Sequence, residues 1–174
     1  MRTFFVLLLL IFGINGAKSQ NLNVEYKSYG GEYSVAVIQP TIENFILLLS
    51  LDENQFENKM KQYKYFEDNS GGKYRAFWNG SLDNFAYAKC VNTFNFNVMR
   101  NEIRFMVDAE MVYPENSITN LYRDLKPYYK DSKSDMDGNI VDYFAFKANG
   151  FVYSFFITNR VKLYDIMVLK ENFQ

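Results

Sequence analysis

The hydrophobic pattern is clearest in the middle of the chain, at residues 93–113. Apolar and polar residues alternate strictly on both sides of Arg100 and Asn101. The apolar positions are Phe94, Phe96 and Val98, then Phe105, Val107, Ala109, Met111 and Tyr113. A period of two residues is typical of a strand with one buried face. The pattern therefore predicts an antiparallel hairpin that turns at Arg100-Asn101, with its apolar face covered by helices.

Apolar residues recur at helical spacing in three other places. Thr41 can cap a first helix, Asp52 and Gln55 can form the capping box of a second, and Asn116 or Ser117 can cap a third. The apolar positions of these helices are Ile42, Phe45, Ile46 and Leu49; Phe56, Met60 and Tyr63; Ile118, Leu121, Tyr122 and Leu125. We therefore expect a pair of helices before the central strands and one helix after them.

The remaining β-rich segments complete the predicted fold. Strands are expected at 32–38, 73–78, 83–91, 140–147 and twice within 151–170, with tight turns at 79–80 and 149–150 and a polar loop at 131–139. The element order is then β-αα-ββββ-α-βββ. Consecutive strands joined by short turns predict an α+β fold with an antiparallel sheet and helices packed on one face. Two tandem helix-plus-meander units, 41–113 and 114–170, are one interpretation of this order.

The chain begins with the pattern of a secretory signal peptide. Arg2 precedes an apolar run, and Ala17 and Ser19 stand at the positions that a signal peptidase reads, so residues 1–19 are expected to be removed. We expect a flexible lead-in at 20–31 and a single domain at 32–174. The composition is similar to that of exported proteins from AT-rich Gram-negative bacteria. A periplasmic or extracellular location follows from this interpretation.

Charge and composition narrow the expected partners. Without Arg2 and Lys18 the chain keeps 17 basic and 20 acidic residues, a net charge of −3. This charge argues against a nucleic-acid partner, because the nucleic-acid backbone attracts basic surfaces. No apolar run in the mature chain is long enough to span a bilayer. The expected partner is another protein or a component of the cell envelope.

Residues that commonly carry catalysis are scarce. The chain has no histidine and one cysteine, Cys90, which removes the commonest general base and the commonest zinc ligands. No cofactor or metal is expected, and Asp135 and Asp137 are interpreted as parts of a solvated turn. The remaining enzymatic alternative is a hydrolase that uses Asp108 and Glu110, which point to the same side of one predicted strand.

Aromatic residues make up 18% of the chain, and several predicted strands carry them on both faces. One sheet face can therefore be an aromatic surface that binds a partner. Trp78, Tyr128 and Tyr129 lie beside predicted turns and are the aromatic residues we expect to be exposed and to bind. These features predict a non-catalytic binding protein. A carrier that encloses a small apolar ligand is the other non-enzymatic alternative.

The predicted element order resembles a known layout. Two successive helix-plus-meander units are similar to those of the tandem-repeat β-lactamase inhibitor proteins and of small outer-membrane assembly factors. The resemblance covers the order of elements and no sequence motif, and the disulfides of those proteins are missing. It implies that a concave sheet grips a protein partner.

Overall fold

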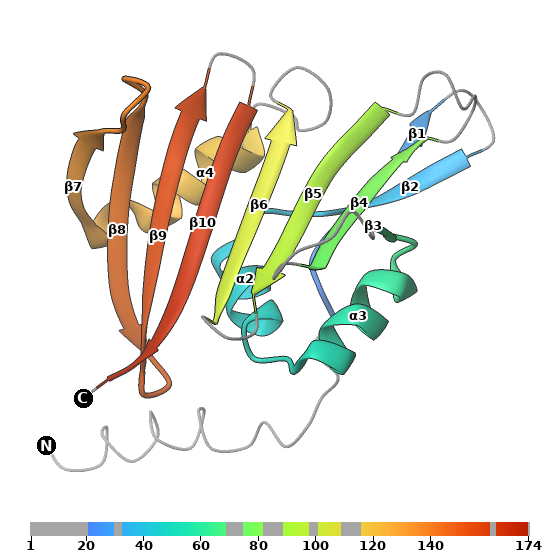
Figure 1. Ribbon diagram of the computed structural model, residues 1–174, viewed down its shortest axis with the longest axis horizontal. Coiled ribbons are helices and arrows are strands. Elements are labelled where there is room, and N and C mark those ends of the chain that lie inside the picture. The colour runs from blue at the N-terminus through green and yellow to red at the C-terminus, as the bar shows by residue number, and fades with distance from the viewer. Residues whose placement is uncertain are drawn as a thin grey trace, which may run out of the picture.

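The computed structural model (Figure 1) describes residues 21–29, 33–68, 75–81, 89–97, 101–108, 116–160 and 163–173. Between residues 66 and 97 the description is limited to the backbone. The predicted signal peptide, residues 1–19, lies outside the described residues. The described elements form an α+β fold with antiparallel sheets, which confirms the predicted fold class.

The N-terminal part contains a hairpin and two helices. Strands β1 (Val24–Tyr29) and β2 (Tyr33–Ile38) pair antiparallel as a separate two-stranded sheet. Helices α2 (Ile42–Leu48) and α3 (Glu53–Gln62) follow. The predicted caps are confirmed: the Thr41 side chain accepts a hydrogen bond from the amide of Asn44, and Asp52 and Gln55 form a capping box.

The remaining strands form one antiparallel sheet in the order β3-β4-β5-β6-β10-β9-β8-β7. Helix α4 (Asn116–Leu125) and the 3-10 turn η2 (Lys126–Tyr128) lie between the two groups of strands along the chain. The strands are β3 (Phe66–Asp68), β4 (Arg75–Ser81), β5 (Lys89–Asn97), β6 (Glu102–Asp108), β7 (Tyr129–Ser134), β8 (Ile140–Ala148), β9 (Phe151–Arg160) and β10 (Leu163–Asn172).

The sheet is made of two meanders that meet in its middle. Strands β3 to β6 form the first and β7 to β10 the second, and β6 pairs antiparallel with β10 at the junction. The predicted central hairpin is present, since β5 pairs with β6 and Phe94 lies opposite Phe105. Asn101 has a positive φ of 47°, as expected at the predicted turn.

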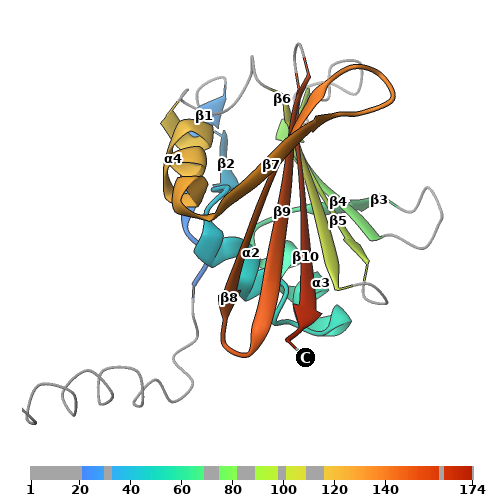
Figure 2. The ribbon, with the colours of Figure 1, turned by 90° about the vertical axis from the view of Figure 1, so that its left-hand side faces the viewer.

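The hydrophobic core lies between the sheet and the elements on one of its faces. Figure 2 shows α2, α4 and the β1–β2 hairpin on the same side of the large sheet. The Phe45 ring of α2 contacts Phe105 of β6 and Phe155 of β9 edge-on, with ring centroids 6.0 and 5.6 Å apart. Leu121 and Leu125 of α4 are also buried. The prediction that helices cover the Phe105 face of the central hairpin is confirmed.

The predicted lead-in, residues 20–31, contains a strand. Residues Val24–Tyr29 form β1, which the sequence pattern did not indicate. The buried side chain of Asn44 binds the backbone on both sides of the hairpin: it accepts from the amide of Asn23 and donates to the carbonyls of Asn23 and Gln39, each at 2.8 Å. Leu22 is buried as well. These contacts connect β1 to the domain, whereas the sequence pattern predicted a lead-in without a strand at Val24–Tyr29.

Other boundaries also differ from the prediction. Asn79 and Gly80 are consecutive residues inside β4, opposite a shift of register that leaves Val91 of β5 without a partner, so they do not form the predicted tight turn. The expected polar loop at 131–139 contains most of β7, whose pairing with β8 runs to Ser134. In contrast, Asn149 and Gly150 both have positive φ, 51° and 79°, and confirm the predicted two-residue turn between β8 and β9.

Candidate binding sites

The three aromatic residues proposed from the sequence do not meet at one site. Trp78 lies in β4, the second strand from one edge of the large sheet. Tyr128 ends η2 and Tyr129 begins β7, at the opposite edge. The side chains of Tyr128 and Tyr129 are 39% and 51% exposed, as predicted for these two. The Tyr128 ring packs on Phe146, with centroids 4.9 Å apart.

Of the two acidic residues considered for catalysis, the structure describes one. Asp108 ends β6, where its backbone pairs with Leu163, while Glu110 lies outside the described residues. Asp135 and Asp137 stand in the turn between β7 and β8, as predicted. The described residues contain no group of three or more acidic or thiol side chains that could hold a metal ion.

A pocket opens between α4 and the edge of the sheet at β8. Its volume is about 460 Å³, and we call it the α4–β8 pocket. One side of α4 and η2, the start of β7 and the adjacent part of β8 supply its lining residues. These are Thr119, Tyr122, Arg123, Lys126, Tyr129, Asp142 and Phe144. Such a volume is within the range of small-molecule sites.

Aromatic rings and a chain of hydroxyl groups shape this pocket. Phe144 is buried, and the rings of Tyr122 and Tyr129 contact it edge-on at centroid distances of 5.8 and 5.7 Å. The Tyr122 hydroxyl donates to Asp142 Oδ2 at 2.9 Å, and the Ser132 hydroxyl donates to the other carboxylate oxygen. The hydroxyls of Tyr129 and Ser132 are 2.9 Å apart. The carboxylate therefore has a donor on each oxygen.

The Tyr122 phenol is held in its protonated form. Burial, followed by the hydrogen bond to Asp142 and the charge of that carboxylate, raises the pKa of Tyr122 well above its ordinary value of 10.0. Below that ordinary value the phenol is protonated in both the folded and the unfolded chain. Above it, the unfolded chain releases the proton and the folded chain keeps it, so this contribution to stability declines as the pH rises.

This behaviour gives a testable pH dependence. At about pH 8, Tyr122→Phe should lower the free energy of unfolding by about 1–2 kcal/mol, because a hydrogen bond to a carboxylate is lost. At about pH 11 the difference between the two proteins should be smaller. Urea unfolding at both pH values measures it. Tyr128→Phe, whose hydroxyl has no partner among the described residues, serves as the control. A difference for Tyr122→Phe that grows with pH would contradict this account.

The second face of the large sheet points away from α2 and α4. Residues paired across neighbouring strands share a face, and Phe105, Phe155 and Ile166 point into the core. The alternate positions therefore form what we call the open face. Two of its cross-strand rows are Arg104, Met167, Phe156 and Tyr143, and Met106, Asp165, Thr158 and Val141. In Figure 2, α2, α4 and the β1–β2 hairpin all lie on the other side of the large sheet.

The open face combines partly exposed apolar groups with buried polar ones. Met106, Met167, Phe156 and Tyr143 are half-buried, and the rings of Tyr143 and Phe156 stack with centroids 4.8 Å apart and planes at 12°. Asp165, in contrast, is buried. The result is a packed apolar surface with polar groups set beneath it.

A charged cluster lies on the open face, near the start of β10. Asp165 accepts hydrogen bonds from Arg104 through both oxygens, one from Nε at 2.8 Å, and Arg160 Nη2 lies 4.0 Å from its Oδ2. The Asp165 side chain is 7% exposed, whereas those of Arg104 and Arg160 are 43% and 41% exposed. Arg160 Nε is buried and has no hydrogen-bond partner among the residues that the structure describes. The guanidinium groups of Arg104 and Arg160 are therefore partly exposed to solvent, and the Asp165 carboxylate is buried beneath them.

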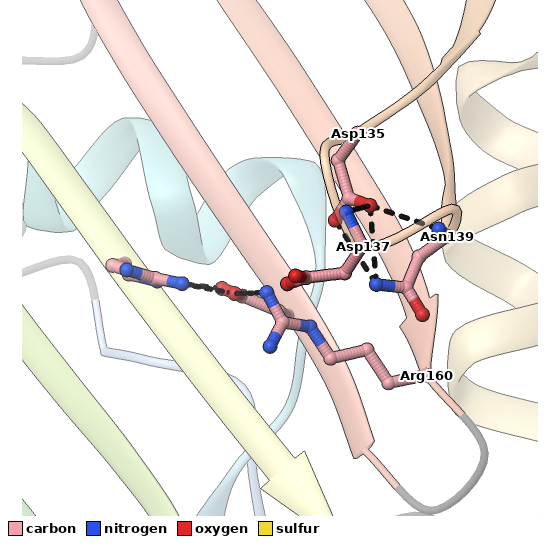
Figure 3. Close-up of polar contacts among 6 residues, drawn as sticks. Asp135, Asp137, Asn139 and Arg160 are labelled. Carbon is pink, nitrogen blue, oxygen red and sulfur yellow. Dashed lines mark hydrogen bonds and ion pairs between the residues drawn. The ribbon is translucent and has the colours of Figure 1, made fainter.

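The turn between β7 and β8 lies beside this cluster (Figure 3). The Asp135 carboxylate accepts from the amides of Asp137 and Asn139 and from the side chain of Asn139. The Asn139 side chain has the largest effect in lowering the pKa of Asp135, and the charge of Arg160 adds to it. The hydrogen bonds that Asp135 accepts stabilise the turn, in agreement with the prediction that this segment is a solvated turn.

Comparisons with known proteins add no functional information. No protein family, no curated protein and no solved structure matches this chain. None of the described helices is long and apolar enough to cross a membrane.

Sequence reasoning missed most of the residues that shape these two surfaces. Lys126 follows a predicted helix, whereas Asp142 and Phe144 lie in a predicted strand. Nothing in the sequence shows that α4 and β8 leave a pocket between them. Asp165 follows Tyr164 and precedes Ile166 in a strand, a pattern typical of an ordinary solvated position. The alternation in β9 and β10 could have indicated Phe156 and Met167 as outward residues, had the Phe105 face been used to set the register.

Proposed function

We propose that this protein is exported and acts without catalysis, by binding another protein through the open face. The observation that carries the proposal is the partly exposed row of Arg104, Met167, Phe156 and Tyr143, on the side of the sheet that faces away from α2 and α4. Contiguous apolar surface that stays partly exposed commonly marks an interaction site. Aromatic, methionine and arginine residues are the types enriched in protein interfaces.

The charges of the open face favour a protein over other partners. Its described side chains include as many bases as acids: Arg104, Lys133, Lys147 and Arg160 against Glu102, Asp131, Asp165 and Glu171. A nucleic acid or an anionic lipid surface would select a basic face. A face with balanced charges and partly exposed apolar groups suits the mixed surface of a protein.

The charged cluster supports a different protein over a second copy of this chain. Arg104 and Arg160 are the exposed members of the cluster, while the Asp165 carboxylate lies beneath them. A second copy that docked face to face about the centre would bring these cations toward their own equivalents. A partner that presents carboxylates or carbonyl oxygens at this point would be attracted by these two partly exposed cations. We infer that the partner has such an acidic patch within an apolar surround.

Site-specific photo-crosslinking tests this proposal. A photo-reactive amino acid replaces Met167 or Tyr143 on the open face, or Glu43 on the outer side of α2 as a control, in cells that make the protein. We expect one protein species to be linked from Met167 and Tyr143 and not from Glu43. The same species, once purified, should form a complex with the mature protein, which should sediment as a monomer when alone.

Three outcomes would overturn the proposal. The first is a crosslink between two copies of this chain from Met167, which would make the open face a self-association surface. The second is equal capture of the same protein from Glu43. The third is the absence of any specific crosslink from the open face in cells where the protein is present at its normal level.

A further inference from the structure

We propose that the α4–β8 pocket binds a small organic anion with a flat apolar body. The site is separate from the open face, because its lining comes from α4, η2 and the helix-facing side of β8. The inference therefore does not depend on the proposed protein partner. It also differs from the expectation of an enclosed apolar carrier, since charged residues line this pocket.

The aromatic part of the lining suits a flat apolar group. Phe144 lies at the base of the pocket, and the rings of Tyr122 and Tyr129 stand edge-on against it. Aromatic rings that are already packed against one another lose little freedom when a ligand arrives. A ring system placed beside them gains dispersion contacts and offset or edge-on ring geometry.

The charged part of the lining favours an anion. Arg123 and Lys126 contribute two positive charges, and Asp142 contributes one negative charge. The Asp142 oxygens already accept from Tyr122 and Ser132. Within the described part of the chain, Arg123 pairs with the exposed Asp124, with Nε 3.1 Å from Oδ1. Lys126 forms no ion pair with any described residue, so it is the charge most available to a ligand.

A cationic ligand fits this arrangement poorly. It would meet Arg123 and Lys126 directly, while the single carboxylate is engaged by two hydroxyl donors. A neutral ligand would gain the aromatic contacts and no charge attraction. The ligand that uses both parts of the lining has an apolar ring or short chain and one acidic group.

Three probes with the same naphthalene ring, similar size and different charge test this inference on the mature protein. They are 2-naphthoate, 2-naphthamide and 2-naphthylmethylammonium, titrated by calorimetry and by NMR of backbone amides. We expect 2-naphthoate to bind with a dissociation constant of about 1 mM or tighter. The amide and the ammonium should bind more weakly, in that order. The amide shifts should centre on Thr119, Tyr122 and Phe144.

Two matched variants test whether Lys126 supplies the positive charge that binds the anion. Lys126→Gln should weaken 2-naphthoate binding by about three- to tenfold, the size of one ion pair at a partly exposed site, and should leave 2-naphthamide binding unchanged. Lys130→Gln removes the same charge from a nearby exposed position outside the lining and should have no effect. Equal binding of the three probes, equal effects of the two variants, or no saturable binding of 2-naphthoate would each overturn the inference.

Discussion

Replacing Phe155 with alanine should lower the free energy of unfolding by about 3–5 kcal/mol. The Phe155 side chain is fully buried on the helix-facing side of β9, where its ring contacts Phe45 of α2 and lies 5.9 Å from the Phe146 ring. Its removal leaves a cavity at the point where the sheet and α2 meet. Urea or guanidinium unfolding of the mature protein measures the loss.

The neighbouring residue provides the matched control. Phe156 has the same side chain, one position along the same strand, on the open face, where it stacks on Tyr143. Phe156→Ala should cost about 1 kcal/mol, since only a cross-strand contact is lost. Equal losses for the two variants would contradict the view that a single face of the sheet is covered.

Replacing Arg104 with leucine should cost about 2–3 kcal/mol. The substitution removes both hydrogen bonds that Arg104 donates to the buried Asp165 carboxylate. Arg160, whose Nη2 is 4.0 Å from that carboxylate, would be the remaining cation in contact. A buried charge without a close partner is unfavourable, so the loss should exceed that of an exposed ion pair.

Two further variants test whether the loss in Arg104→Leu comes from leaving the buried Asp165 carboxylate without its partner. The double variant with Arg104→Leu and Asp165→Leu should come within about 1 kcal/mol of the wild type, because no buried charge is left over. Lys61→Leu breaks the exposed pair with Glu57 on α3 and should cost at most about 0.5 kcal/mol. The account fails here if Arg104→Leu is no more costly than Lys61→Leu.

Local signals account for the parts of the fold that the sequence predicted. Thr41 and Asp52 cap their helices through contacts made within three residues, and Asn149-Gly150 adopts the backbone that its own chemistry favours. The alternation around Phe105 reflects burial on one face of the sheet. Each of these features depends on neighbouring residues or on one regular period, so it can be predicted from the sequence alone.

Long-range contacts account for the parts that it did not predict. Strand β1 depends on hydrogen bonds between Asn23 and Asn44, 21 positions apart. The burial of Asp165 depends on Arg104, 61 positions away. The α4–β8 pocket depends on how far α4 stands from the sheet. None of these has a local pattern, and Tyr129 could be predicted as exposed without any indication of the pocket that it lines.

The dissociation constant of the complex with the captured partner tests the central claim most directly. Two single variants remove a tyrosine ring at comparable cost, Tyr143→Ala on the open face and Tyr129→Ala at the α4–β8 pocket. We expect Tyr143→Ala to weaken the complex at least about tenfold, because central aromatic residues dominate interface energetics, and Tyr129→Ala to leave it unchanged. Weakening by Tyr129→Ala with no effect of Tyr143→Ala would contradict binding through the open face.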